Sequence, residues 1–445
     1  AEPAPPRSRN RQVTKMAIRL NAADKGFEAA FKTLLEGKRE TSVDVNDVVT
    51  AIIADVRKRG DVALVELTNK FDRVSLTAET LRIPDADLDA ALGKCDPATL
   101  EALRLAKSRI EAYHARQKPE DSRFTDAAGV GLGHRWTAVG AVGLYVPGGT
   151  ANYPSSVLMN AVPAKVAGVK RVVMVVPTPD DKVNPLVLAA ARIAGVDEVY
   201  RVGGAQAVAA LAYGTETIAA VDKIVGPGNA FVAAAKRQVF GTVGIDMIAG
   251  PSEILVVADG DNDPDWIAAD LLSQAEHDES SQSILITDDG AFATRVEEAV
   301  IRQLKLLPRE TTATKSWADF GAVIIVKSLD DAVALVDRLA PEHLEIALDD
   351  PEPMAAKISN AGAIFLGRYT PEAIGDYVAG SNHVLPTARS ARFSSGLNVL
   401  DFMKRTSIVR CDAASLAAIG PAAVALAAAE GLDAHGRSVS IRLNK

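Results

Sequence analysis

From residue 139 onward, short runs of apolar residues alternate with longer segments that have helical periodicity. The runs VGAVGLYV, RVVMVV, EVYRV and DKIVG are each followed by a segment long enough to form a helix. A second series begins near residue 252 with EILVVAD and ends with GAIFLG at 362–367. Apolar strands that alternate with helices are typical of parallel sheets covered by helices on both faces. The sequence therefore predicts two α/β units.

Residues 22–120 have a different pattern, which predicts mainly helices. In DVVTAIIADVRKRG, apolar residues from Val49 to Val56 recur at helical spacing, and Gly60 follows as a C-terminal stop. PATLEALRLAKSRIEAYHARQ repeats this pattern at 97–117. His114 lies near the end of that helix, where we expect a solvated surface side chain.

We predict an α/β fold with two Rossmann-like, incomplete parallel-sheet domains and helical N-terminal and C-terminal extensions. Residues 1–24 are expected to form a flexible N-terminal arm. Residues 25–138 and 252–399 are expected to form a first α/β domain together, and residues 139–251 a second. The alanine-rich helices of residues 400–445 are too small to bury a core of their own. We therefore expect them to dock on another domain or another subunit.

Charge and hydropathy argue against two classes of partner. The formal net charge is −8, and the interior of the sequence has no basic run of the kind that nucleic-acid binding requires. No apolar stretch approaches the roughly 18 residues of a membrane span. Cys95 and Cys411 lack metal-ligand spacing, and the N-terminal residues lack the apolar core of a secretory signal. We expect a cytoplasmic protein that binds neither nucleic acid nor membrane.

Two stretches place a histidine close to a side-chain oxygen. In APEHLEI, Glu342 and His343 stand between a proline and a predicted buried strand. A histidine is the natural general base near neutral pH, and a glutamate can activate a water molecule. In LLSQAEHDESSQ, Gln274 and His277 are three residues apart on a predicted helix and so share a face, where both could bind one metal. A solvated turn or a polar helix end would explain either stretch by itself.

Two further stretches carry a histidine in a polar segment bounded by glycine. In GDYVAGSNHVLPT, Asp376 lies in a short predicted helix and His383 in the loop beyond. In EGLDAHGRSV, Glu430 ends a helix that Gly431 is expected to cap, and His435 follows. A set of nitrogen and oxygen ligands of this kind suits zinc.

The best local candidate for nucleotide binding is IVGPGNAF, which is predicted to run from a strand through Gly226-Pro227-Gly228 into a helix. Backbone amides at that helix start could contact a phosphate, but the third glycine of the dinucleotide fingerprint is missing. Asp246 stands at a plausible distance along the chain for a ribose contact. LYVPGG and VGGAQAVAA are further glycine turns at strand ends, where open parallel sheets bind ligands.

Eight motifs occur here in the order in which they occur in histidinol dehydrogenase, and the chain resembles that family. The motifs are GLYVPGG, VGGAQA, GPGNAFV, AGPSEIL, QAEHD, PEHLEI, GDYVAGSNHVLPT and EGLDAHGRSV. The resemblance covers nearly the whole chain, from about residue 25 to residue 445, and leaves only the N-terminal extension unaccounted for.

The resemblance implies a zinc-dependent, NAD-linked homodimer that carries out the last two oxidations of histidine biosynthesis, from L-histidinol through L-histidinaldehyde to L-histidine. It implies that the first domain carries the acid–base pair, that the second forms the NAD side, and that residues 400–445 dock on the partner subunit. The implied acid–base pair is Glu342 and His343. The implied zinc ligands are Gln274, His277, Asp376 and His435. Besides the pair and the ligands, the implied substrate contacts are Ser252, His383 and Glu430. The implied NAD contacts are Tyr145, Gln206 and Asn229.

Three other interpretations stay open on the residues alone. A relative with the same fold could oxidise a different alcohol, although His383 and Glu430 match the substrate contacts of the family. A zinc hydrolase would need no nucleotide. A non-catalytic binding protein would tolerate loss of the Glu342-His343 pair.

Overall fold

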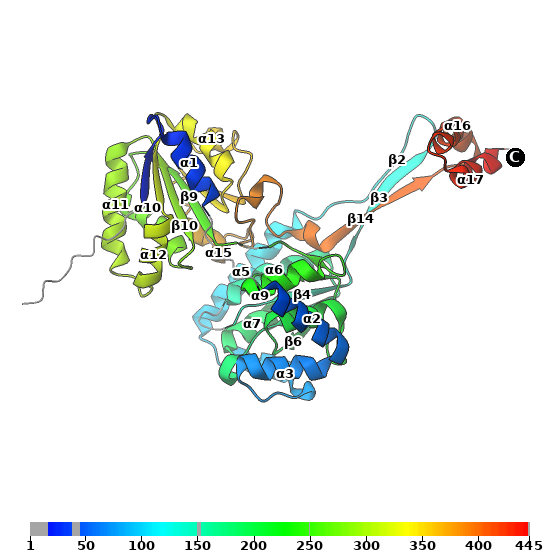
Figure 1. The fold of residues 1–445 in the computed structure, drawn as a ribbon, viewed down its shortest axis with the longest axis horizontal. Coiled ribbons are helices and arrows are strands. Elements are labelled where there is room, and N and C mark those ends of the chain that lie inside the picture. The colour runs from blue at the N-terminus through cyan, green and yellow to red at the C-terminus, as the bar shows by residue number, and fades with distance from the viewer. Residues whose placement is uncertain (1–16, 38–44, 149–152, 249, 444–445) are drawn as a thin grey trace, which may run out of the picture.

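The computed structural model describes residues 17–37, 45–148, 153–248 and 250–443, which form two α/β domains and a projecting arm (Figure 1). Most of the predicted N-terminal arm, residues 1–16, lies outside the described residues. We call the two domains the six-stranded domain and the five-stranded domain, after their sheets. The arm comprises residues 122–138 and 403–443.

The six-stranded domain is built on a parallel sheet with the strand order β1-β11-β10-β9-β12-β13. One face packs against α1, α13 and α14, and the other against α10, α11 and α12. The strands are β1 (Ile18–Asn21), β9 (Glu253–Ala258), β10 (Gln282–Thr287), β11 (Ala322–Ile325), β12 (His343–Ala347) and β13 (Ala363–Leu366). The helices are α1 (Phe27–Glu36), α10 (Pro264–Ala275), α11 (Gly290–Leu304), α12 (Glu310–Phe320), η3 (Leu329–Asp331), α13 (Ala332–Leu339), α14 (Glu352–Ala355), α15 (Glu372–Tyr377) and η4 (Ser390–Arg392).

The five-stranded domain has a parallel sheet with the order β6-β5-β4-β7-β8. Its strands are β4 (Ala141–Tyr145), β5 (Arg171–Val175), β6 (Glu198–Tyr200), β7 (Lys223–Val225) and β8 (Gly244–Ile245). Its helices are α2 (Asn46–Arg59), α3 (Asp61–Asp72), η1 (Ala78–Thr80), α4 (Asp85–Leu92), α5 (Pro97–Ala115), α6 (Pro154–Ala167), η2 (Pro179–Asp181), α7 (Pro185–Ala194), α8 (Gly204–Tyr213), α9 (Ala230–Val239) and η5 (Val399–Phe402).

The two sheets have the same topology apart from β1, which adds an edge strand beside β11. Counted along the chain without β1, β11-β10-β9-β12-β13 and β6-β5-β4-β7-β8 both read 3-2-1-4-5. This is the Rossmann order without its sixth strand, so the prediction of two incomplete Rossmann-like domains is confirmed. Strand order reverses between β9 and β12 in one sheet and between β4 and β7 in the other.

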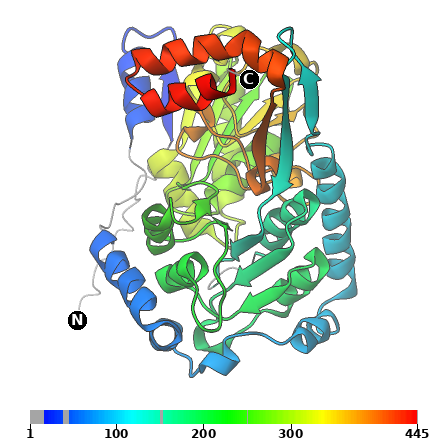
Figure 2. The same ribbon diagram turned by 90° about the vertical axis from the view of Figure 1, so that its right-hand side faces the viewer.

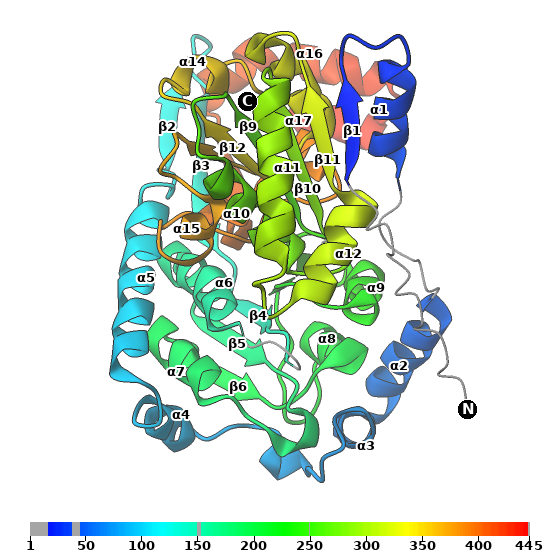
Figure 3. The same cartoon turned by 90° about the vertical axis from the view of Figure 1, so that its left-hand side faces the viewer.

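The predicted domain boundaries need correction. Helices α2 to α5 were assigned to the first domain, but they pack on the five-stranded sheet, where Val49 and Leu64 share a core with Val173 (Figure 3). An amphipathic helix shows that one face is buried but not which sheet covers it. Residues 384–402 also contribute to the core of the five-stranded domain. The predicted flexible segment 1–24 is wrong at 18–21, because these residues form β1 beside β11.

The arm is an antiparallel sheet with two helices at its tip. Strand β14 (Met403–Arg410) pairs with β3 (Gly131–Ala138), which pairs with β2 (Ser122–Thr125). Helices α16 (Ala413–Ala429) and α17 (Asp433–Leu443) pack on each other at the far end, away from both domains (Figure 1). In Figure 2 the arm projects toward the viewer. The prediction of helices alone after residue 400 is therefore wrong for β14, a polar strand with little burial on either face.

The arm exposes apolar side chains that its own helices do not cover. Leu426 is 65% exposed and Ile441 is 54% exposed. Within the described residues, few positions of α16 and α17 are buried. This agrees with the expectation that the tail cannot form a core of its own.

His114 departs from the sequence-based expectation. It was expected to be a solvated surface residue, but its side chain is fully buried, and its Nδ1 donates to the Ile110 carbonyl at 2.8 Å. Burial lowers the pKa of His114, which favours the neutral ring. Helical periodicity places His114 on the same face of α5 as the apolar Leu103 and Ile110, and all three residues are buried.

None of the described helices has the length and apolar composition that a bilayer span requires.

Candidate active site

His343 is the first residue of β12, and its side chain is 3% exposed. Its Nδ1 donates to the Glu253 carbonyl at 2.8 Å, because a carbonyl oxygen can only accept. Burial lowers the pKa of His343, although the nearby charge of Glu372 opposes this effect. The ring is therefore neutral near pH 7, with a proton on Nδ1 and a free electron pair on Nε2.

Glu342 is held by the same neighbour. Its Oε2 accepts a hydrogen bond from the Glu253 backbone N–H at 2.9 Å. Burial raises the pKa of Glu342 well above its usual range, and the carboxylate of Glu253 adds to this effect. The sequence predicted that the adjacent pair could reach one cavity, and the structure adds that both side chains are fixed by the backbone of a single residue.

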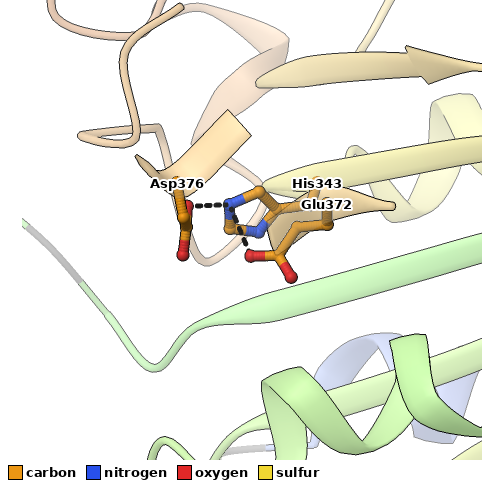
Figure 4. A group of neighbouring side chains, drawn as sticks. All are labelled: His343, Glu372 and Asp376. Carbon is orange, nitrogen blue, oxygen red and sulfur yellow. Dashed lines mark ion pairs between the residues drawn. The ribbon is translucent and has the colours of Figure 1, made fainter. Parts of the chain in front are cut away.

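Two carboxyl groups of α15 face the free Nε2 of His343 (Figure 4). The nitrogen lies 3.6 Å from Glu372 Oε1 and 3.8 Å from Asp376 Oδ1. One donor atom from each of the three side chains lies within 4.8 Å of the others, a spacing that could hold a cation. Burial, followed by the charge of Glu372, raises the pKa of Asp376 to about 8.

Gln274 lies at the end of α10, fully buried. Neither its amide oxygen nor its amide nitrogen has a hydrogen-bond partner among the described residues. Buried polar atoms are nearly always satisfied, so this amide is a candidate for contact with a group that the described chain does not supply. His343 Nε2 and Glu372 Oε1 are likewise buried and without a hydrogen bond in the described chain.

His277 lies just beyond α10, because the helix ends at Ala275. Gln274 and His277 therefore do not share a regular helix, contrary to the prediction from the sequence. A further turn follows the helix, in which the His277 N–H donates to the Gln274 carbonyl at 3.1 Å, and this turn keeps the two residues close. Burial is the main reason why the pKa of both His343 and His383 is lowered, and the nearby His277 adds to this effect in each case.

His383 joins the two domains. Its Nδ1 donates to the Asp376 carbonyl at 3.1 Å, and its Nε2 lies 3.3 Å from the hydroxyl of Ser156 at the start of α6. Chiefly through burial, the pKa of His383 falls to about 4, so the Ser156 hydroxyl donates to a neutral ring. Next to Glu253, Ser252 is partly buried, and its carbonyl accepts the Gln282 N–H at 3.0 Å. The amino end of the six-stranded sheet thus meets the five-stranded domain at this site.

Glu430 and His435 are not brought to this cluster by their own chain. Glu430 is the C-cap of α16, Gly431 follows with φ +70°, and His435 lies in the first turn of α17. Both side chains are exposed on helices at the far tip of the arm (Figure 1). The group spaced to hold a cation consists of His343, Glu372 and Asp376. Of the four predicted zinc ligands, Asp376 belongs to this group, and His435 is distant from it in a single chain.

The three predicted NAD contacts lie at the carboxyl ends of strands in the five-stranded sheet. Tyr145 ends β4 and accepts the Gly204 N–H at 3.0 Å, while its burial raises the pKa to about 12. Gln206 lies in the first turn of α8, buried, with an amide oxygen that has no partner among the described residues. Asn229 caps α9 through hydrogen bonds from the Phe231 and Val232 N–H groups.

Asp246 has a structural role instead of the ribose contact considered from the sequence. Its carboxylate is buried against the Lys236 ammonium and accepts the Gly226 N–H at 2.8 Å. The same ammonium donates to the Gly226 carbonyl at 3.0 Å. The pair therefore secures the glycine turn between β7 and α9 and leaves no free oxygen aimed at a ribose.

Sequence reasoning missed a layer of carboxyl groups behind the site. The carboxyl groups of Glu345 and Asp270 share a hydrogen bond, and Glu345 Oε1 accepts the backbone N–H of Glu372. Through these contacts β12, α10 and α15, which carry His343, Gln274 and Asp376, are tied together. The sequence did contain a sign of this layer, because Glu345 lies inside the apolar strand HLEIALDD. Buried charged residues are rare unless they are paired, so a partner for Glu345 could have been predicted.

Comparisons with known proteins agree over nearly the whole chain. The sequence profile of a family described as histidinol dehydrogenase matches residues 35–443. The histidinol dehydrogenase of Rhodospirillum rubrum is 68% identical over 97% of this chain and 99% of its own length, and that of Rhizobium meliloti is 67% identical over 96% and 99%. The crystal structure of histidinol dehydrogenase from Elizabethkingia anophelis superposes with a TM-score of 0.92 at 36% identity and covers 97% of this chain and 98% of its own.

Glu345→Gln should flatten the pH dependence of stability in the metal-free protein. Burial and the Asp270 charge raise the pKa of Glu345 far above 4.5, so the folded chain keeps a proton that the unfolded chain releases. Stability must then fall as pH rises from the unfolded toward the folded pKa. Glutamine keeps the size and removes the ionisation. Between about pH 5 and pH 8, denaturant titrations should show a smaller loss of unfolding free energy in the variant than in the wild type. The exposed Glu120→Gln should behave as wild type, and an identical decline in all three proteins would contradict the assignment.

Proposed function

Because the chain belongs to the histidinol dehydrogenase family, we propose that it oxidises L-histidinol through L-histidinaldehyde to L-histidine, with NAD⁺ as the electron acceptor and zinc as the metal. The observation that carries the proposal is the environment of His343. Its Nδ1 is fixed on a backbone carbonyl, and its free Nε2 points to the buried polar cluster. A neutral histidine in this state is a general base ready to accept a proton from an alcohol.

The donor atoms around the cluster fit zinc. We propose Gln274, His277, Asp376 and His435 as the ligands, since imidazole nitrogens and amide or carboxylate oxygens suit this ion. The buried amide of Gln274, which has no hydrogen-bond partner among the described residues, supports a ligand at this place. When bound, zinc would orient the imidazole and the amine of the substrate, and its charge would lower the pKa of neighbouring carboxyl groups.

The proposed chemistry divides the adjacent pair. His343 Nε2 takes the alcohol proton in the first oxidation and acts as a base again in the second. Glu342 acts on the aldehyde step, where its carboxylate activates the water that attacks the carbonyl. Burial raises the pKa of Glu342, which favours its protonated form, and the charge of a bound metal would favour the carboxylate that this role requires. Ser252, His383 and Glu430 are proposed to contact the substrate.

The five-stranded domain is proposed to bind the dinucleotide with Tyr145, Gln206 and Asn229. Tyr145 and Asn229 follow β4 and β7, the two strands between which strand order reverses. Gln206 follows the edge strand β6, and the start of its helix reaches β4 through the Gly204 N–H, which donates to the Tyr145 hydroxyl at 3.0 Å. Open parallel sheets bind ligands at such points. The unpaired buried amide oxygen of Gln206 supports a ligand there. NAD⁺, when bound, would accept the hydride that leaves the substrate carbon in each oxidation.

A homodimer with shared sites is proposed to complete the zinc ligands. Glu430 and His435 stand on a projecting arm with exposed apolar side chains, which could dock on a second copy. Each site would then combine the cluster of one chain with the tail of the other. We also retain the proposal of a cytoplasmic enzyme, with which the two free cysteines, Cys95 and Cys411, agree.

His277→Asn should lose zinc and with it most NADH formation from L-histidinol. Asparagine shortens the side chain and removes the imidazole donor, while the exposed position tolerates it structurally. Elemental analysis of the purified protein measures the metal directly, and a chelator should reduce the wild type to a similar rate. His134→Asn on the arm strand β3 is the control and should keep its zinc. Full zinc content in His277→Asn would show that this residue is not a ligand.

Glu342→Gln should separate the two oxidations. Glutamine keeps the size and the hydrogen bond from Glu253 but cannot take a proton from water. The variant should oxidise L-histidinol once and then stall, while His343→Asn should slow both steps. Loss of one positioned base typically costs about 10²–10⁴-fold, so single-turnover NADH formation from L-histidinol and from L-histidinaldehyde should separate clearly. Equal slowing of both steps by Glu342→Gln would rule out the division of roles.

A further inference from the structure

We propose that the side chain of Glu253 is a positioning residue that holds the acid–base pair and the loop behind His383 in one arrangement. The inference rests on the proposed function, because it concerns the geometry of Glu342 and His343. It adds a role for a buried carboxylate that makes no contact with the reacting atoms in that proposal.

The backbone of Glu253 contacts both members of the pair. Its N–H donates to Glu342 Oε2 at 2.9 Å, and its carbonyl accepts from His343 Nδ1 at 2.8 Å. Both groups belong to the first residue of β9, which directly follows the loop residues Pro251 and Ser252. Any rotation at this position would change the acid and the base together. The pair therefore depends on whatever fixes residue 253 at the edge of the sheet.

The Glu253 side chain reaches across to a strained turn. It is 6% exposed, and its Oε1 accepts the backbone N–H of Ala388 at 3.2 Å. Ala388 and the next residue, Arg389, have φ angles of +51° and +63°. Left-handed conformations are unfavourable for residues with a Cβ and persist only where surrounding contacts hold them. The Glu253 carboxylate provides one such contact, and the Thr387 hydroxyl, which accepts the Gly250 N–H, provides another.

The strained turn is connected to His383 by buried chain. Residues 384–387 are all buried, and Val384 is paired by its carbonyl with the Leu397 N–H at 2.8 Å. The same segment packs tightly against Gly362. A Cβ atom at Gly362 would lie 3.1 Å from the Pro386 ring and 2.5 Å from the Glu342 carbonyl oxygen. Because this segment is packed, a shift of the turn at Ala388 would be passed to His383 and to the Glu342 backbone.

Two substitutions separate the reach of the side chain from its charge. Glu253→Gln keeps an oxygen at the same distance and loses the charge. Glu253→Asp keeps the charge but is shorter by one methylene, roughly 1.5 Å, and cannot reach the Ala388 N–H. If holding the turn is the role of this residue, the glutamine variant should remain active and the aspartate variant should not.

The experiment measures single-turnover and steady-state NADH formation from L-histidinol and L-histidinaldehyde, with zinc content and thermal midpoint measured in parallel. We expect the rates of Glu253→Gln to stay within about threefold of the wild-type rates. Glu253→Asp should be slower by about 10- to 100-fold in both oxidations, since a displacement of a catalytic group by about 1 Å can lower the rate by about 10²-fold. Gln282→Ala is the matched control. Gln282 pairs with Glu253 across β9 and β10, and its side chain donates to the Phe320 carbonyl. Alanine removes this side-chain contact and keeps the backbone N–H that donates to Ser252, so both rates should stay unchanged.

A second variant tests the strain directly, including the case in which Glu253→Asp is unstable. Glycine adopts a left-handed φ without cost, so Ala388→Gly in the Glu253→Asp background should recover both folding and part of the lost rate. Wild-type rates in Glu253→Asp, equal loss in Glu253→Gln and Glu253→Asp, or no recovery by Ala388→Gly would each overturn the inference. Failure of the wild type to form NADH from L-histidinol would instead overturn the proposed function.

Discussion

The parallel register between β9 and β12 determines the geometry of the candidate site. It pairs His343 with Ile254 and so brings the acid–base pair beside the backbone of Glu253. Alternate residues of β12 point to opposite faces, and Leu344 and Ile346 are buried in the core on the far side from His343. A shift of one residue would exchange these faces and move the imidazole into that core. Hydrophobic burial therefore fixes the position of the general base.

Two copies of one sheet topology place the two halves of the site against each other. The acid–base pair lies at the amino end of the six-stranded sheet, and the proposed dinucleotide contacts lie at the carboxyl end of the five-stranded sheet. The loop that carries His383 bridges them, with contacts to Asp376 on one side and Ser156 on the other. Oxidation of an alcohol needs a base and a hydride acceptor close to the same substrate carbon. The facing ends of the two sheets would place the proposed base and the proposed dinucleotide site on either side of that carbon.

The sequence predicted the sheets well because their strands are apolar on both faces. The roles of the adjacent pair and of Gln274 stay predictions that rest on polar motifs at strand and helix ends, and all three residues are buried. It did not predict which sheet α2 to α5 would cover, since an amphipathic helix carries no information about its partner. Strand β14 was missed because MKRTSIVR has no buried face. Glu372 and Glu345 were missed because their role depends on the proximity of α15, α10 and β12, which are far apart in sequence.

The arm holds two of the proposed site residues away from the cluster of their own chain. His435 and Glu430 stand on exposed helices far from Gln274, and those helices bury little of their own surface. The central claim is that a second copy completes each cluster with its tail. Heterodimers of an inactive His343→Asn chain and an inactive His435→Asn chain test it, because one of their two sites would contain both wild-type residues. The account predicts about half of the wild-type rate per heterodimer. Verified heterodimers without activity would show that each site is built from a single chain.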